Sequence, residues 1–182
     1  MTAPASVVCA DERSDGGELL PLDVDRWAAL ADAVLDAQDA RGELTVTFVD
    51  IADIAELNAE HMGKEGPTDV LSFPLDDGDV VPGVPALLGD VVVCPEVALA
   101  QFADHAGTFD DEIALLIVHG ILHVLGHDHG DADEAQRMRV LERELLEAHH
   151  WQGPAPEGFR HTHPDDPDSA EPDPAAPVEP TL

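Results

Sequence analysis

The sequence predicts a single globular domain that combines strands with helices, and three observations support this. A chain of 182 residues can bury one sizeable core, whereas two full domains would each lie near the lower limit for independent folding. Hydrophobic residues make up 44% of the chain and charged residues 26%, as in an ordinary globular protein. Four strand-like runs and five segments of helical periodicity follow in the order β-α-β-α-β-β-α-α-α.

Strands and helices alternate in the first part of the predicted domain. Strands are expected at 5–10 and 44–49, and helices at 23–40 and 53–62. Apolar side chains recur at helical spacing from Trp27 to Ala37, which predicts an amphipathic helix. Asp53 is expected to cap the second helix, and Gly63 is expected to end it.

The second part of the domain is predicted to begin with two strands and to end with three helices. Strands are expected at 70–73 and 87–94, and helices at 95–102, at 110–126 and from 131 onward. Pro95 suits the first position of a helix. Asp110 and Asp111 supply a cap and an acidic first turn, and Asp131 with Glu134 resembles a capping box.

The last thirty residues differ from the rest in composition. Gly153–Leu182 holds eight of the fifteen prolines among Asp, Glu and Ala, a mixture that cannot form a core. We therefore expect a folded domain over 1–152 and a disordered acidic, Pro-rich tail over 153–182. One arginine against seven acids gives the tail a charge of −6, which leaves −25 of the total −31 on the body.

The charge and the cysteines restrict the class of protein. With 39 acidic residues against 8 basic ones, nonspecific binding to nucleic acid is excluded and DNA is not expected as a partner. The longest apolar stretch, Ile113–Val118, is far shorter than the ~20 residues that a membrane span needs. No basic, apolar leader begins the chain, so a cytoplasmic location is expected. Cys9 and Cys94 are too few for a disulfide framework and suggest small buried side chains.

The candidate metal-binding residues of the chain form a histidine motif. His119 and His123 are four residues apart, so their imidazoles point from one helical face and can bind one ion. Gly126 can adopt a positive φ and turn the chain back, which would bring His129 to the same ion. Three imidazoles with an open fourth position are typical of catalytic zinc. We therefore expect one Zn²⁺ per chain and a hydrolytic reaction.

The histidine spacing equals that of metzincin proteases, but the residue that follows the first histidine differs. Those proteases carry the glutamate base there, and this chain carries Gly120. The motif thus argues against peptide hydrolysis, although a metallopeptidase-like hydrolase remains an alternative. Glu112 lies two turns before His119 and is interpreted as part of the helix start.

Two polar neighbours of the third histidine have open roles. His127 is either a ligand that competes with His129 or, as we favour, a group that contacts the ligands or the substrate. Asp128 either orients an imidazole through its free N–H or stabilises the turn.

Three separated motifs together resemble the YbeY family. They are His119-Gly-x-Leu-His123-x-x-Gly-x-Asp-His129, Leu57-Asn58 with Gly66-Pro67-Thr68-Asp69-Val70-Leu71-Ser72-Phe73-Pro74, and Leu88-Gly89-Asp90-Val91. That family comprises bacterial zinc-dependent endoribonucleases of ribosomal RNA maturation. The resemblance implies an α+β fold, in which a small mixed four-stranded sheet is covered by about five helices. It also implies zinc on the three matched histidines.

The same resemblance implies a substrate and partners. The expected function is single-strand-specific cleavage of RNA in late ribosome maturation, at the 3′ end of 16S rRNA, and in ribosome quality control. The expected partners are single-stranded rRNA and the small ribosomal subunit or its proteins. A noncatalytic ribosome-assembly factor, in which zinc only stabilises the fold, is a second alternative.

The sequence departs from the family at one pair of residues. Where family members often carry an aromatic residue followed by arginine, this chain has His61-Met62. Lys64 is the nearest cation and either reaches the phosphate or lies solvated in its loop. Lysine offers a point charge rather than the bidentate fork of arginine.

Other polar residues have two interpretations each. Thr68, Asp69 and Ser72 either seat a strand or line the metal cleft. Arg139 and Arg143 either contact RNA or, with Glu142 and Glu144 beside them, form a solvated helix face. Lys64, Asp69, His127 and Asp128 are therefore candidate catalytic helpers, and the sequence does not identify the general base.

Overall fold

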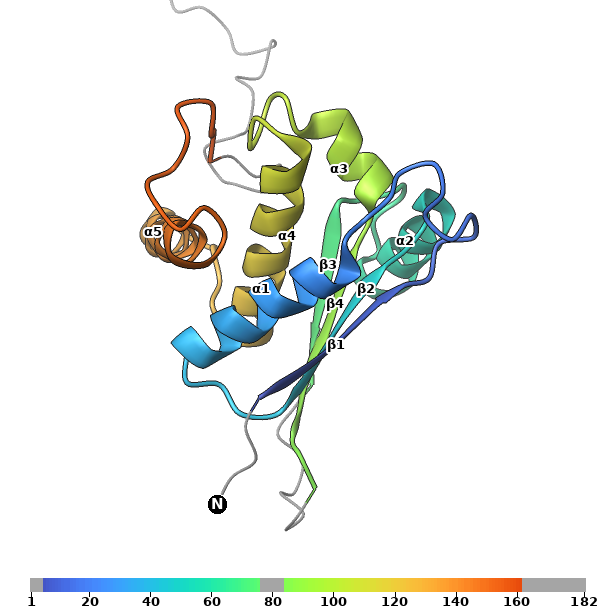
Figure 1. Cartoon of the computed structure of the whole chain (residues 1–182). Helices are drawn as coiled ribbons and strands as arrows, with labels where there is room; N and C mark the ends of the chain where they lie inside the picture. The colour runs from blue at the N-terminus through green and yellow to red at the C-terminus, as the bar shows by residue number, and fades with distance from the viewer. Residues whose placement is uncertain (1–4, 76–83, 162–182) are drawn as a thin grey trace, which may run out of the picture.

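A computed structural model describes residues 5–75 and 84–161, and a four-stranded sheet lies at its centre (Figure 1). The strands are β1 (Ser6–Asp11), β2 (Glu43–Phe48), β3 (Val70–Pro74) and β4 (Leu87–Val93). Their order is β1-β2-β4-β3, in which β1, β2 and β4 run parallel and β3 runs antiparallel to β4. The sheet is mixed, and the predicted α+β class of the single domain is confirmed.

Within the described residues, five α-helices pack on the two faces of the sheet or on one another. They are α1 (Val24–Ala37), α2 (Ile51–Leu57), α3 (Pro95–Gln101), α4 (Phe109–Val124) and α5 (Ala132–His149). Helix α4 packs against β3 and β4 and α1 packs against β1, while α5 packs on the outer side of α4 (Figure 1). The main core lies between the sheet and these three helices. A smaller apolar cluster, which includes Val49, Ile54 and Leu71, forms beneath α2 on the other face.

Helix α4 is the central helix of the domain. Its residues from Asp111 to Leu122 are all buried, because the helix has the sheet on one side and α1 and α5 on the other. Gly120 permits the close approach to β4: a Cβ at this position would lie 2.5 Å from Cγ1 of Val91. The Ser72 hydroxyl of β3 donates to the Gly120 carbonyl oxygen at 3.1 Å. The helix that carries the histidines is therefore fixed to the sheet at that turn.

The predicted helix starts are partly confirmed. Asp23 and Asp131 cap α1 and α5, since their carboxylates accept hydrogen bonds from backbone N–H groups three residues on. The cap predicted at Asp110 or Asp111 is wrong, because the Thr108 hydroxyl accepts the N–H of Asp111 at 3.1 Å and caps α4. The two aspartates do form its acidic first turn.

The predicted second helix differs most from the structure. The cap predicted at Asp53 is wrong: α2 begins at Ile51 after Asp50, whose carboxylate accepts the Ser14 N–H instead of capping. Its last turn widens into a π-helix, η1 (Asn58–Met62). Gly63, at φ +64°, ends the helix as expected.

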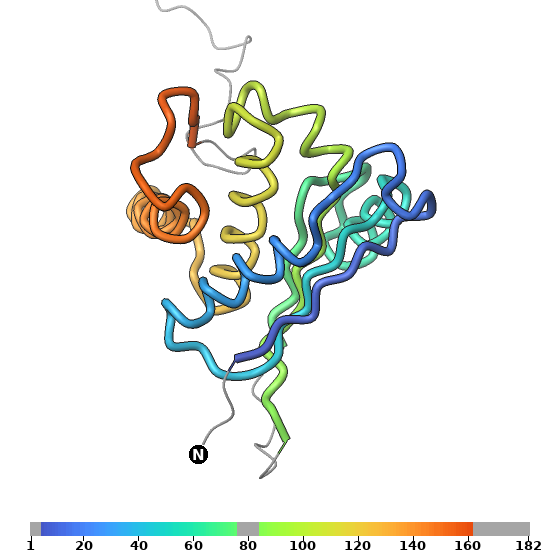
Figure 2. Tube along the Cα trace, viewed as in Figure 1, coloured from blue at the N-terminus to red at the C-terminus, as the bar shows by residue number. Residues whose placement is uncertain are grey.

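The segment that follows α5, orange to red in Figure 2, loops beside that helix on the side of α4 that is away from the sheet. The predicted tail boundary at 153 places residues 153–161 outside the domain, yet Phe159 packs against the main core. The remainder of the predicted tail, 162–182, lies outside the described residues, and its disorder stays a prediction. None of the helices in the described part of the chain combines the length and the apolar character that a membrane span requires.

Candidate metal centre

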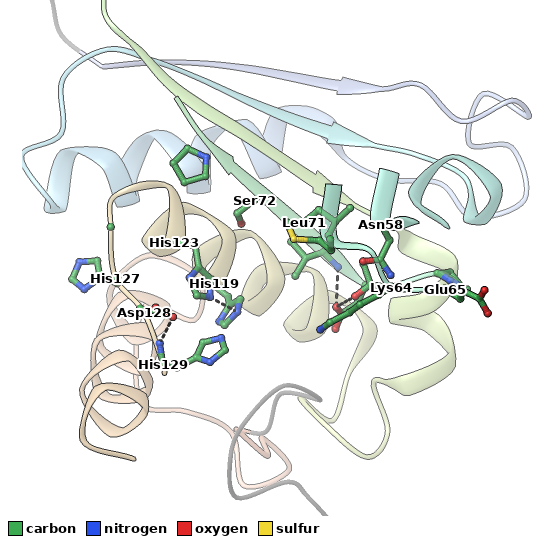
Figure 3. A pocket seen from close by; sticks show the side chains of 17 residues that line it. Asn58, Lys64, Glu65, Leu71, Ser72, His119, His123, His127, Asp128 and His129 are labelled. Carbon is green, nitrogen blue, oxygen red and sulfur yellow. Dashed lines mark hydrogen bonds between the residues drawn. The ribbon is translucent and has the colours of Figure 1, made fainter. Parts of the chain in front are cut away.

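Two histidines face each other on the last turns of α4. His119 and His123 are one turn apart, and their Nε2 atoms lie 3.1 Å from each other. His119 is buried at 7% exposure, whereas His123 is half-buried. Figure 3 shows both side chains on the side of the helix that faces the cleft. The predicted juxtaposition of these two imidazoles is present.

The loop after α4 brings the third histidine to the other two. Gly126 has φ +93°, and the His127 N–H bonds back to the Leu122 carbonyl oxygen at 2.9 Å. The Asp128 carboxylate accepts the backbone N–H of His129 at 2.7 Å. The turn places the His129 ring centroid 4.8 Å from that of His123. Of the two roles considered for Asp128, the structure supports stabilisation of the turn.

The three histidines form a cluster that could hold a metal ion. One nitrogen from each of His119, His123 and His129 lies within 4.8 Å of the others. Tetrahedral zinc with Zn–N bonds of 2.0–2.1 Å would place its ligand nitrogens about 3.3 Å apart. The 3.1 Å between the Nε2 atoms of His119 and His123 matches this spacing, and a nitrogen of His129 lies within 4.8 Å of both. Burial, followed by the neighbouring His119 and His129, lowers the pKa of His123 to about 4. At neutral pH the imidazole of His123 is therefore neutral, the form that binds metals.

A buried carboxylate orients the first histidine. Nδ1 of His119 lies 2.6 Å from Oε1 of Glu142 on α5, and the glutamate side chain is only 1% exposed. With Nδ1–H donating to the carboxylate, Nε2 keeps its lone pair for the cluster. The interpretation of Glu142 as part of a solvated helix face is wrong. The sequence does contain a signal for the burial of Glu142. This residue stands four positions after Met138 and three before Leu145, at the spacing of the buried side of α5.

A cleft of about 590 Å³ opens in front of the histidines. Besides the three ligand candidates, its lining includes all four predicted helpers, Lys64, Asp69, His127 and Asp128. The family-like stretch from Pro67 to Ser72 forms part of its wall. The structure thus brings together residues that lie more than fifty positions apart in the sequence.

Lys64 lies on the wall opposite the histidines (Figure 3). Its loop follows η1 and is held by Asn58, whose side-chain amide donates to the Gly66 carbonyl oxygen at 2.9 Å. Asn58 is buried and itself lines the cleft. Lys64 is also exposed to solvent, so it lines the cleft while both interpretations of its role stay open.

Asp69 lines the cleft, but its carboxylate is used to hold the fold. Oδ1 accepts the Val70 N–H at 2.8 Å, and Oδ2 accepts Nε2 of Gln101 at 2.6 Å. Gln101 Nε2 also lies 2.7 Å from Oε1 of Glu112, which is buried at 1% exposure. Glu112 therefore joins α4 to α3 and the start of β3, a wider role than the helix start assigned to it.

His127 stands apart from the other three histidines. Its side chain is exposed, and the cluster of potential metal ligands found among the described residues does not include it. Figure 3 shows its ring on the outer side of the loop, away from the other three rings. The structure thus supports the view that His129 rather than His127 completes the cluster.

In this structure, position 120, where metzincin proteases carry the glutamate base, has no room for a side chain. Gly120 faces β4 rather than the cleft, and any side chain there would collide with Val91. The sequence argument against a metzincin mechanism thus has a structural cause.

Comparison with known proteins identifies what the chain resembles. The family model described as Endoribonuclease YbeY matches residues 17–150. The chain is 45% identical over 136 residues to Endoribonuclease YbeY of Salinispora tropica, covering 69% of this chain and 87% of that protein. It is 47% identical over 136 residues to the protein of the same name from Thermobifida fusca, covering 70% and 86%.

A solved structure has a similar fold. The solution structure of TM1509 from Thermotoga maritima matches with a TM-score of 0.50 and 25% identity, over 81% of this chain and 91% of that one.

Proposed function

Because the chain belongs to the YbeY family of endoribonucleases, we propose that it cleaves single-stranded RNA with one zinc ion held by His119, His123 and His129. The proposed substrate is the 3′ end of 16S rRNA during late maturation of the small ribosomal subunit, with a further role in ribosome quality control. The proposed partners are that subunit or its proteins, and the proposed location is the cytoplasm. The observation that carries the proposal is the histidine cluster in the wall of a cleft large enough for a nucleotide.

The donor set favours zinc. Three imidazoles suit a borderline metal ion and leave one coordination position open, as in catalytic rather than structural zinc sites. When bound, zinc supplies Lewis acidity for hydrolysis of a phosphodiester bond. His119 presents Nε2 because Glu142 holds its Nδ1–H, and His123 stays neutral because it is buried. The chain thus prepares two of its three ligands before the metal arrives.

The opposite wall of the cleft supplies the positive charge for the phosphate. Lys64 lines this wall where the family often carries arginine two positions earlier, at the position of Met62. A single ammonium group can neutralise one phosphate oxygen, although it cannot form the two parallel hydrogen bonds of a guanidinium. We assign phosphate binding to Lys64, with Asp69 holding the start of β3 in place behind it.

A matched pair of substrates tests this function. Purified, zinc-loaded protein is given an RNA that contains the 3′ end of 16S rRNA, either single-stranded or annealed to its complement. We expect cleavage of the single strand and little cleavage of the duplex. Cleavage of peptides with no effect on either RNA would instead indicate the metallopeptidase-like alternative. Ribosome association without RNA cleavage would indicate the assembly factor.

A further inference from the structure

We propose that the segment after α5, residues 150–161, is part of the metal centre and that His161 is a positioning residue for His119, acting through Glu142. This inference rests on the proposed function, since it concerns the same histidine cluster. The family match ends at residue 150, so all of the segment except His150 lies beyond the part of the chain that the family description covers. Its role follows from contacts within this structure.

The carboxylate of Glu142 has an imidazole at each oxygen. Oε1 lies 2.6 Å from Nδ1 of His119, and Oε2 lies 2.5 Å from Nε2 of His161. Both contacts are shielded, because the side chain of Glu142 is 1% exposed and that of His161 is 16% exposed. A carboxylate held at both oxygens cannot rotate freely, so His161 fixes the plane in which Glu142 meets His119.

The start of the segment is tied to the first turn of α4. The Trp151 indole N–H donates to Oδ1 of Asp111 at 2.6 Å, and Nε2 of His150 lies 2.8 Å from the same oxygen. The Gly153 N–H donates to the Glu147 carbonyl oxygen at 2.9 Å. These bonds hold the chain in the loop that it forms at the end of α5 (Figure 2).

The far end of the segment is held by packing. The Phe159 ring meets Trp151 edge to face, with 4.8 Å between centroids, and packs against the main core. The backbone of Gly158 touches Gly107, where a Cβ would collide with the Gly158 carbonyl oxygen. His161 lies two residues after Phe159, so the packing of Phe159 on the core brings the imidazole of His161 to Glu142.

Zinc affinity of the full-length chain, measured by competition with a chromogenic chelator, tests the role of His161. Loss of a group that orients a metal ligand typically costs 10–100-fold in affinity, so His161→Ala is expected to weaken zinc binding about tenfold. His161→Gln is expected to restore most of the affinity, because its amide N–H can still donate to Glu142. His149→Ala, in the last turn of α5, is the matched control and should bind zinc like the wild type.

A double-variant comparison separates this route from a general effect on folding. In a Glu142→Gln background, His161→Ala is expected to add less than twofold, since both residues act on His119 through one contact. Equal zinc affinity of His161→Ala and the wild type would overturn the inference, and so would full additivity with Glu142→Gln. A wild-type chain that binds no zinc would overturn the proposed function as well, whereas normal wild-type binding with an unaffected His161→Ala would overturn this inference alone.

Discussion

At the scale of single residues, the three ligand candidates are prepared in different ways. His119 is oriented by a buried carboxylate, and His123 is kept neutral by burial. His129 is placed by a turn in which Gly126 adopts a positive φ and Asp128 bonds the backbone. The sequence shows the three imidazoles and the glycine directly, but it shows no partner that lies on another element.

Cys9 gives a prediction of pH dependence at the residue scale. Burial, followed by the charges of Asp11 and Asp25, raises the pKa of this thiol to about 11. Because the thiolate is the reactive form, alkylation by iodoacetamide at pH 8 should be slow and should rise about tenfold per pH unit up to about pH 11. Site-resolved mass spectrometry measures the rate. A plateau near pH 9, as for a free thiol, would contradict the assigned environment.

The raised pKa of Cys9 also makes the stability of the fold depend on pH. A raised pKa means that the folded state favours the protonated thiol, so this contribution is complete below the ordinary pKa of 9.0 and is lost as the pH rises toward 11. The free energy of unfolding should accordingly fall over that interval by more in the wild type than in Cys9→Ala.

For helices and strands, the sequence predicts which elements exist and of which type they are. It predicts less well which partners their polar side chains have. All four strands and all five α-helices occur near their predicted positions, because their apolar periodicity reflects the core directly. The predicted caps of α2 and α4 are wrong because several polar residues lie near each helix start, and spacing alone does not show which of them bonds to the helix. Glu142 was misjudged because two nearby arginines favoured a solvated face, although its place between Met138 and Leu145 indicated burial.

The contact between α4 and β4 gives a prediction for Gly120. Gly120→Ala would place a methyl group 2.5 Å from Val91 Cγ1, so the helix or the strand must shift. Overpacking of this kind typically costs 1–3 kcal/mol, and we expect a loss of about 2 kcal/mol in the free energy of unfolding by urea denaturation. Gly126→Ala is not a neutral control because its φ is positive, so Ala29→Gly, at an exposed position of α1, serves to gauge helix propensity. Wild-type stability of Gly120→Ala would contradict the close packing.

The C-terminal segment gives a prediction about truncation. A chain ending at residue 161 retains Phe159 and His161, and we expect its melting temperature and zinc content to match those of the full chain. A chain ending at residue 152 loses the packing of Phe159 on the core and should melt several degrees lower. Equal melting temperatures for the two truncations would show that 153–161 contributes nothing to the domain.

At the scale of the whole molecule, the charge of −31 opposes binding to a polyanion. Repulsion between an acidic body and RNA is screened over about 10 Å at 0.1 M salt, whereas contact between metal and phosphate is screened much less. RNA cleavage at saturating zinc should therefore stay constant or rise as monovalent salt increases from low to moderate concentration. Ordinary basic RNA-binding proteins lose affinity steeply over the same range. A steep fall here would mean that Lys64 and three arginines of α5, Arg137, Arg139 and Arg143, form a basic RNA-binding surface.

In the proposed function, RNA cleavage requires zinc on the three histidines. The most direct measurement removes metal from the purified chain with a chelator and follows cleavage of a single-stranded RNA as zinc is titrated back. We predict that activity disappears and then returns in proportion to bound zinc, up to about one ion per chain. His123→Ala should bind no stoichiometric zinc and remain inactive, whereas His127→Ala should still bind it. Full cleavage by the metal-free chain, or stoichiometric zinc in His123→Ala, would contradict the claim.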